Sequence, residues 1–412
     1  MDAIERKTYR RHRGAALFEG SYSSIIWSTP EIARKGLGAD YLMVTLIVMA
    51  PAVAQSLALF VAGRIAATHP RRLIRTCGFI GRIPIVLLFF LPADPWIFLT
   101  IVTWQALAYV PIISAWNGVL RSNYTESTRG RLFGGASRFQ SVAGAITVIG
   151  SGFWAHHDPQ AFRVFLPIAA GLGIISCLIF SGVPLRERSR AAPPAVRLGS
   201  PRALLRTLVV DRNFFRYELG FFCYGLGFMA LGTALPFITV DHLDLDWNVL
   251  LGAKAIPSLI GVALAPFFGR VMDRIGAPRL GAYAFAGLIV YGGLLALAVG
   301  PVTYCLVTVV FGIAMTGVLI LWNMGPVAFA KEGEAMRYMS VHVALVGLRG
   351  IIGHPIGGWI AAKAGDPRWV IVFSTILWIL GSVVMWRLSQ KMRREAAEAA
   401  KAAEAGPEPE SP

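Results

Sequence analysis

Long apolar runs, separated by short and mostly basic polar segments, make up nearly the whole chain. Each run of about 20 residues is long enough to cross the roughly 30 Å hydrocarbon layer of a bilayer as a helix. Inside lipid, backbone amides must be hydrogen-bonded within their own segment, so we expect helices rather than open sheets. The predicted spans are 14–34, 41–62, 73–92, 97–120, 134–155, 164–183, 214–240, 248–268, 280–299, 301–326, 338–361 and 369–387.

The composition favours the same class of protein. Of the 412 residues, 55% are hydrophobic and 15% are charged, whereas a soluble chain carries about 25% charged residues. The N-terminal MDAIERKTYRRHRG is charged, so we expect no secretory signal peptide. The four cysteines fall in predicted spans without metal-ligand spacing. We therefore expect a multi-pass membrane protein with no metal site and no cofactor.

The positive charges indicate how the chain is oriented. The net charge is +16, and 31 of the 39 Lys and Arg residues lie in loops or near span ends on one side of the predicted bilayer and five on the other. Cytoplasmic loops carry such an excess of Lys and Arg. We expect both termini in the cytoplasm and the chain in the cytoplasmic (inner) membrane. The charge then follows topology, and no nucleic-acid partner is predicted.

The two halves of the chain repeat each other. With the sequence shifted by 206 positions, residues 63–64 fall on 269–270 as Gly-Arg, and 116–117 fall on 322–323 as Trp-Asn. A repeat of six helices returns the chain to the same side, so the two copies have parallel orientation. Transporters contain repeats of this kind, related by an axis along the membrane normal.

The repeat predicts four parts. Residues 1–185 form an N-terminal six-helix bundle and residues 213–388 a C-terminal one. Between them, 186–212 reads as a basic cytoplasmic linker with a short amphipathic helix on the membrane face. The tail, 389–412, begins with helix-forming residues and ends in Pro and Glu, so we expect it to be solvated and partly disordered.

The loop GRVMDRIGAPRL, residues 269–280, resembles the loop signature of the major facilitator superfamily. That signature has Gly, three variable residues, Asp, a basic residue, one variable residue, Gly and further basic residues. The first-half copy, 63–73, departs from it, because Ala67 stands at the Asp position and Thr68 at the basic one. The residues that match are Gly269, Asp273, Arg274, Gly276 and Arg279.

The resemblance implies an all-α membrane protein with twelve helices in two parallel six-helix repeats that rock about a central site. In that geometry Asp273 accepts hydrogen bonds from the N-terminus of the fifth span, near Arg131, where the helix dipole favours an anion. This contact would be a latch that closes the cytoplasmic side in one state and breaks in the other. A simpler reading, in which Asp273 and Arg274 only orient the loop, stays open.

Ionisable side chains within spans are the candidate binding residues, because each costs roughly 2.5–3.5 kcal/mol to insert. Arg349, near the middle of the eleventh span with His342 and His354 on neighbouring turns, is the strongest candidate. Glu19 either binds substrate or a proton, or forms a salt bridge at the cytoplasmic edge. A structural ion pair is expected for Arg82. The candidates for substrate or coupling-ion binding are Glu19, Tyr22, Trp27, Gln105, Tyr109, Lys254, Arg349 and His354.

These residues lead to a functional hypothesis. We expect a secondary active transporter that moves a small solute by alternating access and acts as a monomer. Two cations against one carboxylate favour an anionic or zwitterionic solute, with protons as the candidate coupling ion through Glu19. The alternative is a membrane sensor or scaffold that keeps the fold without transport. The sequence has no GxxxxGK[ST] loop and no catalytic constellation, so we expect neither ATP-driven transport nor an enzyme.

Overall fold

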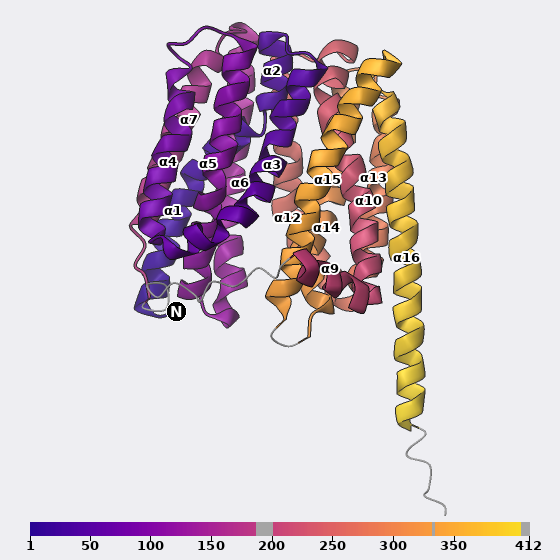
Figure 1. Cartoon of the computed structure of the whole chain (residues 1–412). Helices are drawn as coiled ribbons and strands as arrows, with labels where there is room; N and C mark the ends of the chain where they lie inside the picture. Colours follow the sequence, from indigo (N-terminus) through magenta and orange to yellow (C-terminus); the bar gives the residue numbers. More distant parts are fainter. Residues whose placement is uncertain (187–200, 332–333, 405–412) are drawn as a thin grey trace, which may run out of the picture.

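The computed structural model describes residues 1–186, 201–331 and 334–404, and these residues contain helices and no strand (Figure 1). Residues 187–200 of the predicted linker and 405–412 of the predicted tail lie outside the described residues. The helices of the first half are α1 (Ala3–Ile26), α2 (Thr29–Leu37), α3 (Tyr41–Ala67), α4 (Pro70–Leu87), α5 (Pro95–Asn123), α6 (Glu126–His157) and α7 (Phe162–Ser181).

The second half begins with a short helix on the connection between the halves. Its elements are α9 (Pro201–Val210), α10 (Arg212–Phe237), the π-helical turn η1 (Ile238–His242), α11 (Trp247–Gly252), α12 (Ala255–Ile275), α13 (Ala277–Ala296), α14 (Pro301–Met324), the 3-10 turn η2 (Pro326–Phe329), α15 (Ala335–Ala364) and α16 (Trp369–Glu404). Each predicted span coincides with one of these helices or with a consecutive pair.

The spans differ from the prediction mainly at their ends. The first span is broken into α1 and α2 at Trp27 and Ser28, and Pro30 occupies the first turn of α2, where a missing N–H costs no hydrogen bond. At the other end of the chain, α16 continues without a break to Glu404. The boundary drawn at residue 388 is therefore not the end of a helix, because the Ala-rich segment that follows favours helix.

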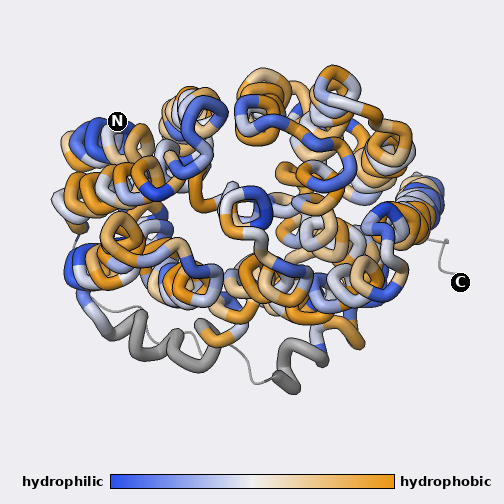
Figure 2. The backbone as a smooth tube through the Cα atoms, turned by 90° about the horizontal axis from the view of Figure 1, so that it is seen from above, coloured by the Kyte–Doolittle hydropathy of each residue, from blue (hydrophilic) through white to orange (hydrophobic). Residues whose placement is uncertain are grey.

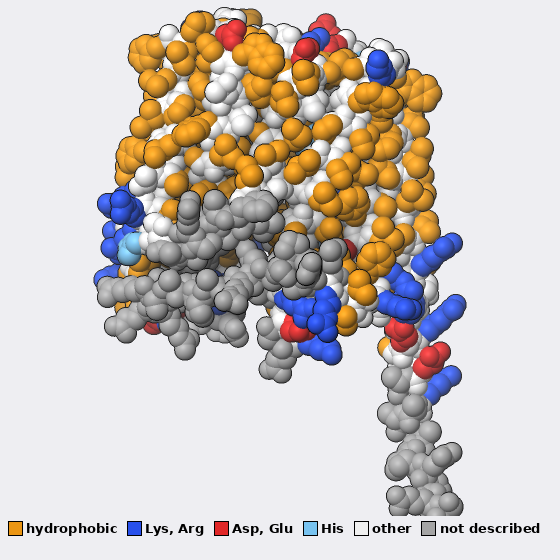
Figure 3. Space-filling view, viewed as in Figure 1, with side chains coloured by type: hydrophobic (Ala, Val, Ile, Leu, Met, Phe, Trp, Pro, Cys, Tyr) orange, Lys and Arg blue, Asp and Glu red, His pale blue; other side chains and the backbone are white. Residues whose placement is uncertain are grey.

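Over the described residues, eight helices are long and apolar enough to cross a membrane by length and composition. The other predicted spans belong to α1 with α2, α3, α4 and α6. Charged residues at the start of α1, α4 and α6 lower their mean hydropathy. In Figure 3 exposed apolar side chains cover most of a broad band, while Lys and Arg gather along the lower edge and on the protruding part of α16.

The helices pack as two groups that follow the halves of the sequence. In the first, α1 packs against α6 and α7, and α4 against α5 and α7. In the second, α10 packs against α15 and α16, and α13 against α14 and α16. The groups meet where α3 contacts α15 and where α6 contacts α11 and α12. Seen from above, the helices stand nearly end-on, with the N-terminus and α16 on opposite sides (Figure 2).

The molecule has two ends, which we name by what they carry. The N-terminus, α9 and the protruding part of α16 mark the terminal face, at the bottom of Figure 1. The opposite face carries α2 at the top of the same view, together with η1 and α11, which follow the far end of α10.

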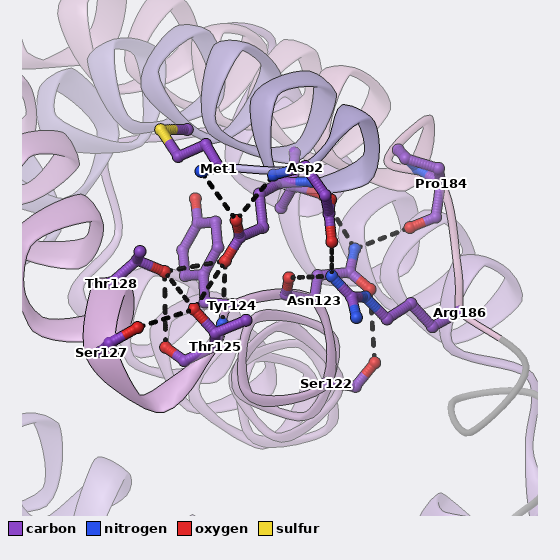
Figure 4. Close-up of polar contacts among 12 residues, drawn as sticks. Met1, Asp2, Ser122, Asn123, Tyr124, Thr125, Ser127, Thr128, Pro184 and Arg186 are labelled. Carbon is purple, nitrogen blue, oxygen red and sulfur yellow. Dashed lines mark hydrogen bonds and ion pairs between the residues drawn. The ribbon is translucent and has the colours of Figure 1, made fainter.

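A polar clasp fastens the start of α1 to the connection between α5 and α6 (Figure 4). Asp2 caps α1, and Glu5 completes a capping box with it. Glu5 Oε1 also accepts hydrogen bonds from the Thr125 backbone N–H at 3.0 Å and from the Thr125 and Thr128 hydroxyls at 3.0 and 2.8 Å. The Thr125 N–H, and after it the Thr128 hydroxyl, lower the pKa of the Glu5 carboxyl to about 2.

The residues after α7 join the same clasp (Figure 4). Asn123 donates from Nδ2 to the Thr8 hydroxyl at 2.9 Å and to the Pro184 carbonyl at 2.7 Å. Arg186 bonds to the Asp2 carboxylate and, at 3.3 Å, to the Asn123 carbonyl. The clasp therefore ties together the start of α1, the end of α5, the start of α6 and the exit from α7 at the terminal face.

Replacing Glu5 by Gln should weaken the clasp, because charge-assisted hydrogen bonds become neutral ones. We expect the free energy of unfolding at pH 7 to fall by about 1–3 kcal/mol. The folded-state pKa is depressed, so this stabilisation is present above pH 4.5 and is lost as the pH falls from about 4.5 toward 2.

Thermal unfolding of both proteins between pH 7 and pH 3 measures this difference. The gap between them should narrow on acidification, and the exposed Glu398→Gln should leave the unfolding midpoint unchanged at every pH. A gap that stays constant down to pH 3 would show that the carboxylate does not hold the clasp.

Candidate functional site

The first half contains a buried ion pair between α1 and α4. Arg82 Nη2 lies 2.8 and 2.9 Å from the two carboxylate oxygens of Glu19, and both side chains are buried. The Arg82 Nη1 donates to the Gly173 carbonyl and to Cys177 Sγ on α7. The guanidinium also stands over the ring of Tyr22, 4.1 Å from its centroid. The structural pairing expected for Arg82 thus has Glu19 as its acid.

The fourth-span candidates, Gln105 and Tyr109, lie near this ion pair, because Gln105 interacts with Tyr22, and Tyr109 with Glu19 and Arg82. Gln105 is buried and Tyr109 is half-buried on α5, and neither makes a hydrogen bond within the described part of the chain. Tyr109 packs against an apolar cluster that includes Trp116 and Phe180. The Tyr22 hydroxyl is buried with no hydrogen-bond partner among the described residues. The structure therefore brings Gln105 and Tyr109 to the surroundings of Glu19 and Tyr22, and a role of these residues in binding remains a prediction.

At the opposite face, charged side chains join the two bundles. Lys254, between α11 and α12, lies with its Nζ 2.8 Å from a carboxylate oxygen of Glu31 on α2. The same Nζ donates to the backbone carbonyl of Trp27 at 3.0 Å, and the Trp27 side chain is 73% exposed. The ammonium group of Lys254, a predicted binding candidate, is therefore held by two groups of the first bundle.

Two further contacts of this kind lie beside it. Arg34 on α2 donates from Nε and Nη2 to the carboxylate of Asp241 in η1, at 2.9 to 3.0 Å. Lys35 donates to the Leu245 carbonyl at 2.8 Å. We call the contacts Arg34–Asp241, Lys35–Leu245 and Lys254–Glu31 the outer gate. These residues come from both halves of the sequence, and only the fold shows that they meet.

In the second half, Arg349 lies inside the bundle between α15 and α10. It is 3% exposed, donates from Nη1 to the Phe221 carbonyl at 2.8 Å, and stands over the rings of Phe221 and Tyr224. A side chain at Gly225 would collide with its guanidinium, so the glycine makes room for it. Among the described residues Arg349 forms no ion pair. His354 instead exchanges hydrogen bonds with Thr233.

A buried carboxylate in the second half was not predicted. Glu218 on α10 is 2% exposed, and its two oxygens lie 3.0 and 3.1 Å from Nδ1 of His342 on α15. The sequence did contain a signal for this buried acid, because Glu218 is the one acidic residue in the apolar run NFFRYELGFF. It stands close to the basic end of that run, where it resembles a loop residue.

The predicted latch contact is not formed among the described residues. Asp273 is exposed at the terminal face and makes no hydrogen bond or ion pair with any residue that the structure describes. Arg131, at the start of α6, is also exposed. Gly276 turns the chain between α12 and α13 with φ +81°, which strains any other residue. The contact between Asp273 and α6 would therefore belong to another conformation, and it remains a prediction.

The other predicted latch residues lie at the end of α12 and the start of α13. The guanidinium of Arg279 stands over the rings of Tyr283 and Trp386, at 5.9 and 5.7 Å. Arg274 is exposed, and a side chain added at Gly269 would meet open space. Over the described residues no group of three or more His, Cys, Asp or Glu could hold a metal ion.

The sequence matches the family model for the major facilitator superfamily over residues 14–348. The chain belongs to the major facilitator superfamily. It is accordingly a multi-pass membrane protein of a transporter family, and the predicted family and helical fold are confirmed. No curated protein matches the sequence.

Solved structures of other superfamily transporters share the fold. The nucleoside transporter NupG has a TM-score of 0.66 at 13% identity, over 95% of this chain and 99% of that one. The human organic anion transporter MFSD10 (TETRAN) has 0.63 at 16%, over 93% and 100%. A bacterial homologue of the human drug peptide transporters PepT1 and PepT2 has 0.69 at 14%, over 95% and 99%. At these identities the likeness shows the fold and not the substrate.

The Glu19–Arg82 pair predicts a large stability effect. Glu19→Gln leaves a buried guanidinium without its acid, and we expect a loss of about 3–5 kcal/mol in the free energy of unfolding. Because removing both charges leaves no unpaired ion, Glu19→Gln with Arg82→Gln should recover part of that loss.

Thermal unfolding of the purified protein measures this effect. Glu334→Gln, which removes an exposed acid from a local pair, should change the stability by less than about 0.5 kcal/mol. An unfolding midpoint for Glu19→Gln equal to that of the unmodified protein would contradict a structural role for the pair.

Proposed function

We propose that this protein is a secondary active transporter that moves a small solute across the cytoplasmic membrane by alternating access. The observation that carries the proposal is the unequal state of the two faces. The outer gate links the bundles through Arg34–Asp241, Lys35–Leu245 and Lys254–Glu31. At the terminal face, Asp273 has no partner among the described residues.

Two of the three outer-gate contacts have the energetics of a reversible contact. The side chains of Arg34 and Asp241 are 27% and 39% exposed, and an ion pair with that much access to water contributes about 0–1 kcal/mol. Lys35 meets only a backbone carbonyl. Such contacts select one arrangement of the bundles, and thermal motion breaks them on the time scale of domain motion.

The distribution of basic residues supports the orientation. Both ends of the described chain lie at the terminal face (Figure 1), and the excess of Lys and Arg follows the loops on that side. By the positive-inside rule the terminal face is cytoplasmic. The structure then corresponds to an inward-facing state, with the outer gate closed and the Asp273 latch released.

Charge inside the second bundle supports an anionic or zwitterionic solute. Glu31 is paired with Lys254 and Glu19 with Arg82, whereas Arg349 has no acid in contact among the described residues. The solved relatives are named for nucleosides, organic anions and peptides, and these classes form the panel to test. We propose protons as the coupling ion and a monomer as the working unit.

A sensor or scaffold that has lost transport remains the second candidate, and the first-half loop favours it, because Ala67 replaces the acidic residue. The outer gate argues for transport. The Arg34–Asp241 pair joins the two bundles and is partly exposed to water, as a contact that breaks and re-forms in a transport cycle requires.

Counterflow in proteoliposomes, with labelled nucleosides, organic anions and peptides, tests the proposal. Arg34→Asp places two carboxylates together at the outer gate, and their repulsion destabilises the state in which this gate is closed. We expect the exchange rate to fall about fivefold or more, because a free-energy change of about 1.4 kcal/mol changes the ratio of two states tenfold. The exchanged pair Arg34→Asp with Asp241→Arg should restore most of the rate.

Arg368→Asp is the matched control, because Arg368 pairs with Asp366 in its own loop and not across the bundles. It should leave the exchange rate unchanged. Absence of counterflow for every compound in the panel would favour the sensor or scaffold, and a double variant no faster than the single one would remove the outer gate from the mechanism.

A further inference from the structure

The buried ion pair of the first half is a poor place for an exchangeable proton. Glu19 receives two short contacts from one guanidinium nitrogen of Arg82, and arginine keeps its proton at any physiological pH. A proton added to Glu19 would leave the buried cation without its counter-charge. The pair therefore stays ionised and neutral overall, which favours a structural role.

The pair Glu218–His342 has a different character. The two side chains are 2% and 0% exposed, and His342 Nδ1 faces both carboxylate oxygens at 3.0 and 3.1 Å. His342 Nε2 has no partner among the described residues. The imidazole lies edge-on to Phe221 and Trp322, with ring centroids 4.8 and 5.9 Å apart. Histidine is the side chain whose charge changes near neutral pH.

The charged and titratable groups around the pair are few. Arg349 lies two turns further along α15 and bonds only to the Phe221 carbonyl. Tyr217 lies next to Glu218 on α10, and its hydroxyl donates a hydrogen bond to the Leu321 carbonyl. No other Asp, Glu, Lys or Arg in the described residues bonds to Glu218, His342 or Arg349. The cluster therefore contains one acid, one permanent cation and one histidine.

We propose that Glu218 and His342 form the proton-binding site of this transporter, with Arg349 setting its charge. With His342 neutral, Glu218 and Arg349 balance and the cluster has no net charge. One bound proton gives the cluster a charge of +1 among side chains that are at most 3% exposed. By linkage, an anion bound nearby would strengthen proton binding, and the proton would strengthen anion binding equally.

The site lies between the helices that touch the other bundle. Two glycines allow α15 to pack close to α3, since side chains at Gly350 and Gly358 would collide with Ala52 and Thr45. α10 also contacts α2 and α3. A charge that appears between α10 and α15 therefore acts on two helices of the interbundle contact. This inference rests on the proposed transport function and names its coupling residues.

Trp322 gives a test that needs no substrate, because a protonated imidazole quenches the fluorescence of a neighbouring indole. The full chain in neutral-lipid nanodiscs is titrated between pH 5 and pH 9. We expect a fluorescence transition that disappears in Trp322→Phe, which identifies the reporter, and in His342→Gln. His156→Gln, which removes an exposed histidine, should leave it unchanged.

Two charge variants give the decisive directions. Glu218→Gln removes the acid that favours a cationic imidazole, and the transition should move to lower pH by about one unit or more. Arg349→Gln removes the opposing cation, and the transition should move to higher pH by a similar amount. Gel filtration and thermal unfolding show that each variant is folded.

A midpoint that neither variant moves, or a transition that persists in folded His342→Gln, would overturn the proposal. The failure of the transport proposal looks different. If counterflow is absent while the transition follows these variants, the proton site stands and transport does not. If counterflow is present without the transition, transport stands and the proton site is elsewhere.

Discussion

A charge that is taken out of water is stabilised by a partner, and in the interior of each bundle one buried acid takes its partner from the same bundle. Glu19 pairs with Arg82 inside the first bundle, and Glu218 pairs with His342 inside the second. Breaking a buried pair by moving one partner away costs about 3–5 kcal/mol, whereas an exposed pair such as Arg34–Asp241 contributes about 0–1 kcal/mol. Motion is therefore confined to the contact between bundles.

The two copies of the loop differ in their residues and in how they turn the chain. The second-half loop keeps Asp273 and turns at Gly276 in a backbone conformation that suits glycine. The first-half copy runs into α4 at Pro70, which begins the helix without an acid to offer the other bundle. The side chains of residues 58–67 lie outside the described part of the chain. An acidic latch is thus available from one half, while the outer gate draws residues from both.

Much of the fold could be predicted from the sequence, because a membrane span needs about 20 apolar residues and a bilayer fixes that length. Residues 63–64 and 269–270 revealed the repeat. The partners could not be predicted, since pairing depends on how each helix is rotated and on contacts far apart in sequence. Glu19 and Arg82 were both visible as charges in spans, yet the ion pair between them was not. Glu218 was missed because an acid near the end of a span resembles a loop residue.

The most direct test of rigid bundles that alternate at their two faces is a pair of interbundle distances. Spin labels at Gln160 and Val299 report on the opposite face, and labels at Lys7 and Lys331 on the terminal face, in a chain whose four cysteines are replaced. Double electron–electron resonance should show that Arg34→Asp lengthens the first distance and shortens the second, while labels within one bundle keep theirs. Lengthening at both faces, or a changed distance within a bundle, would contradict the account.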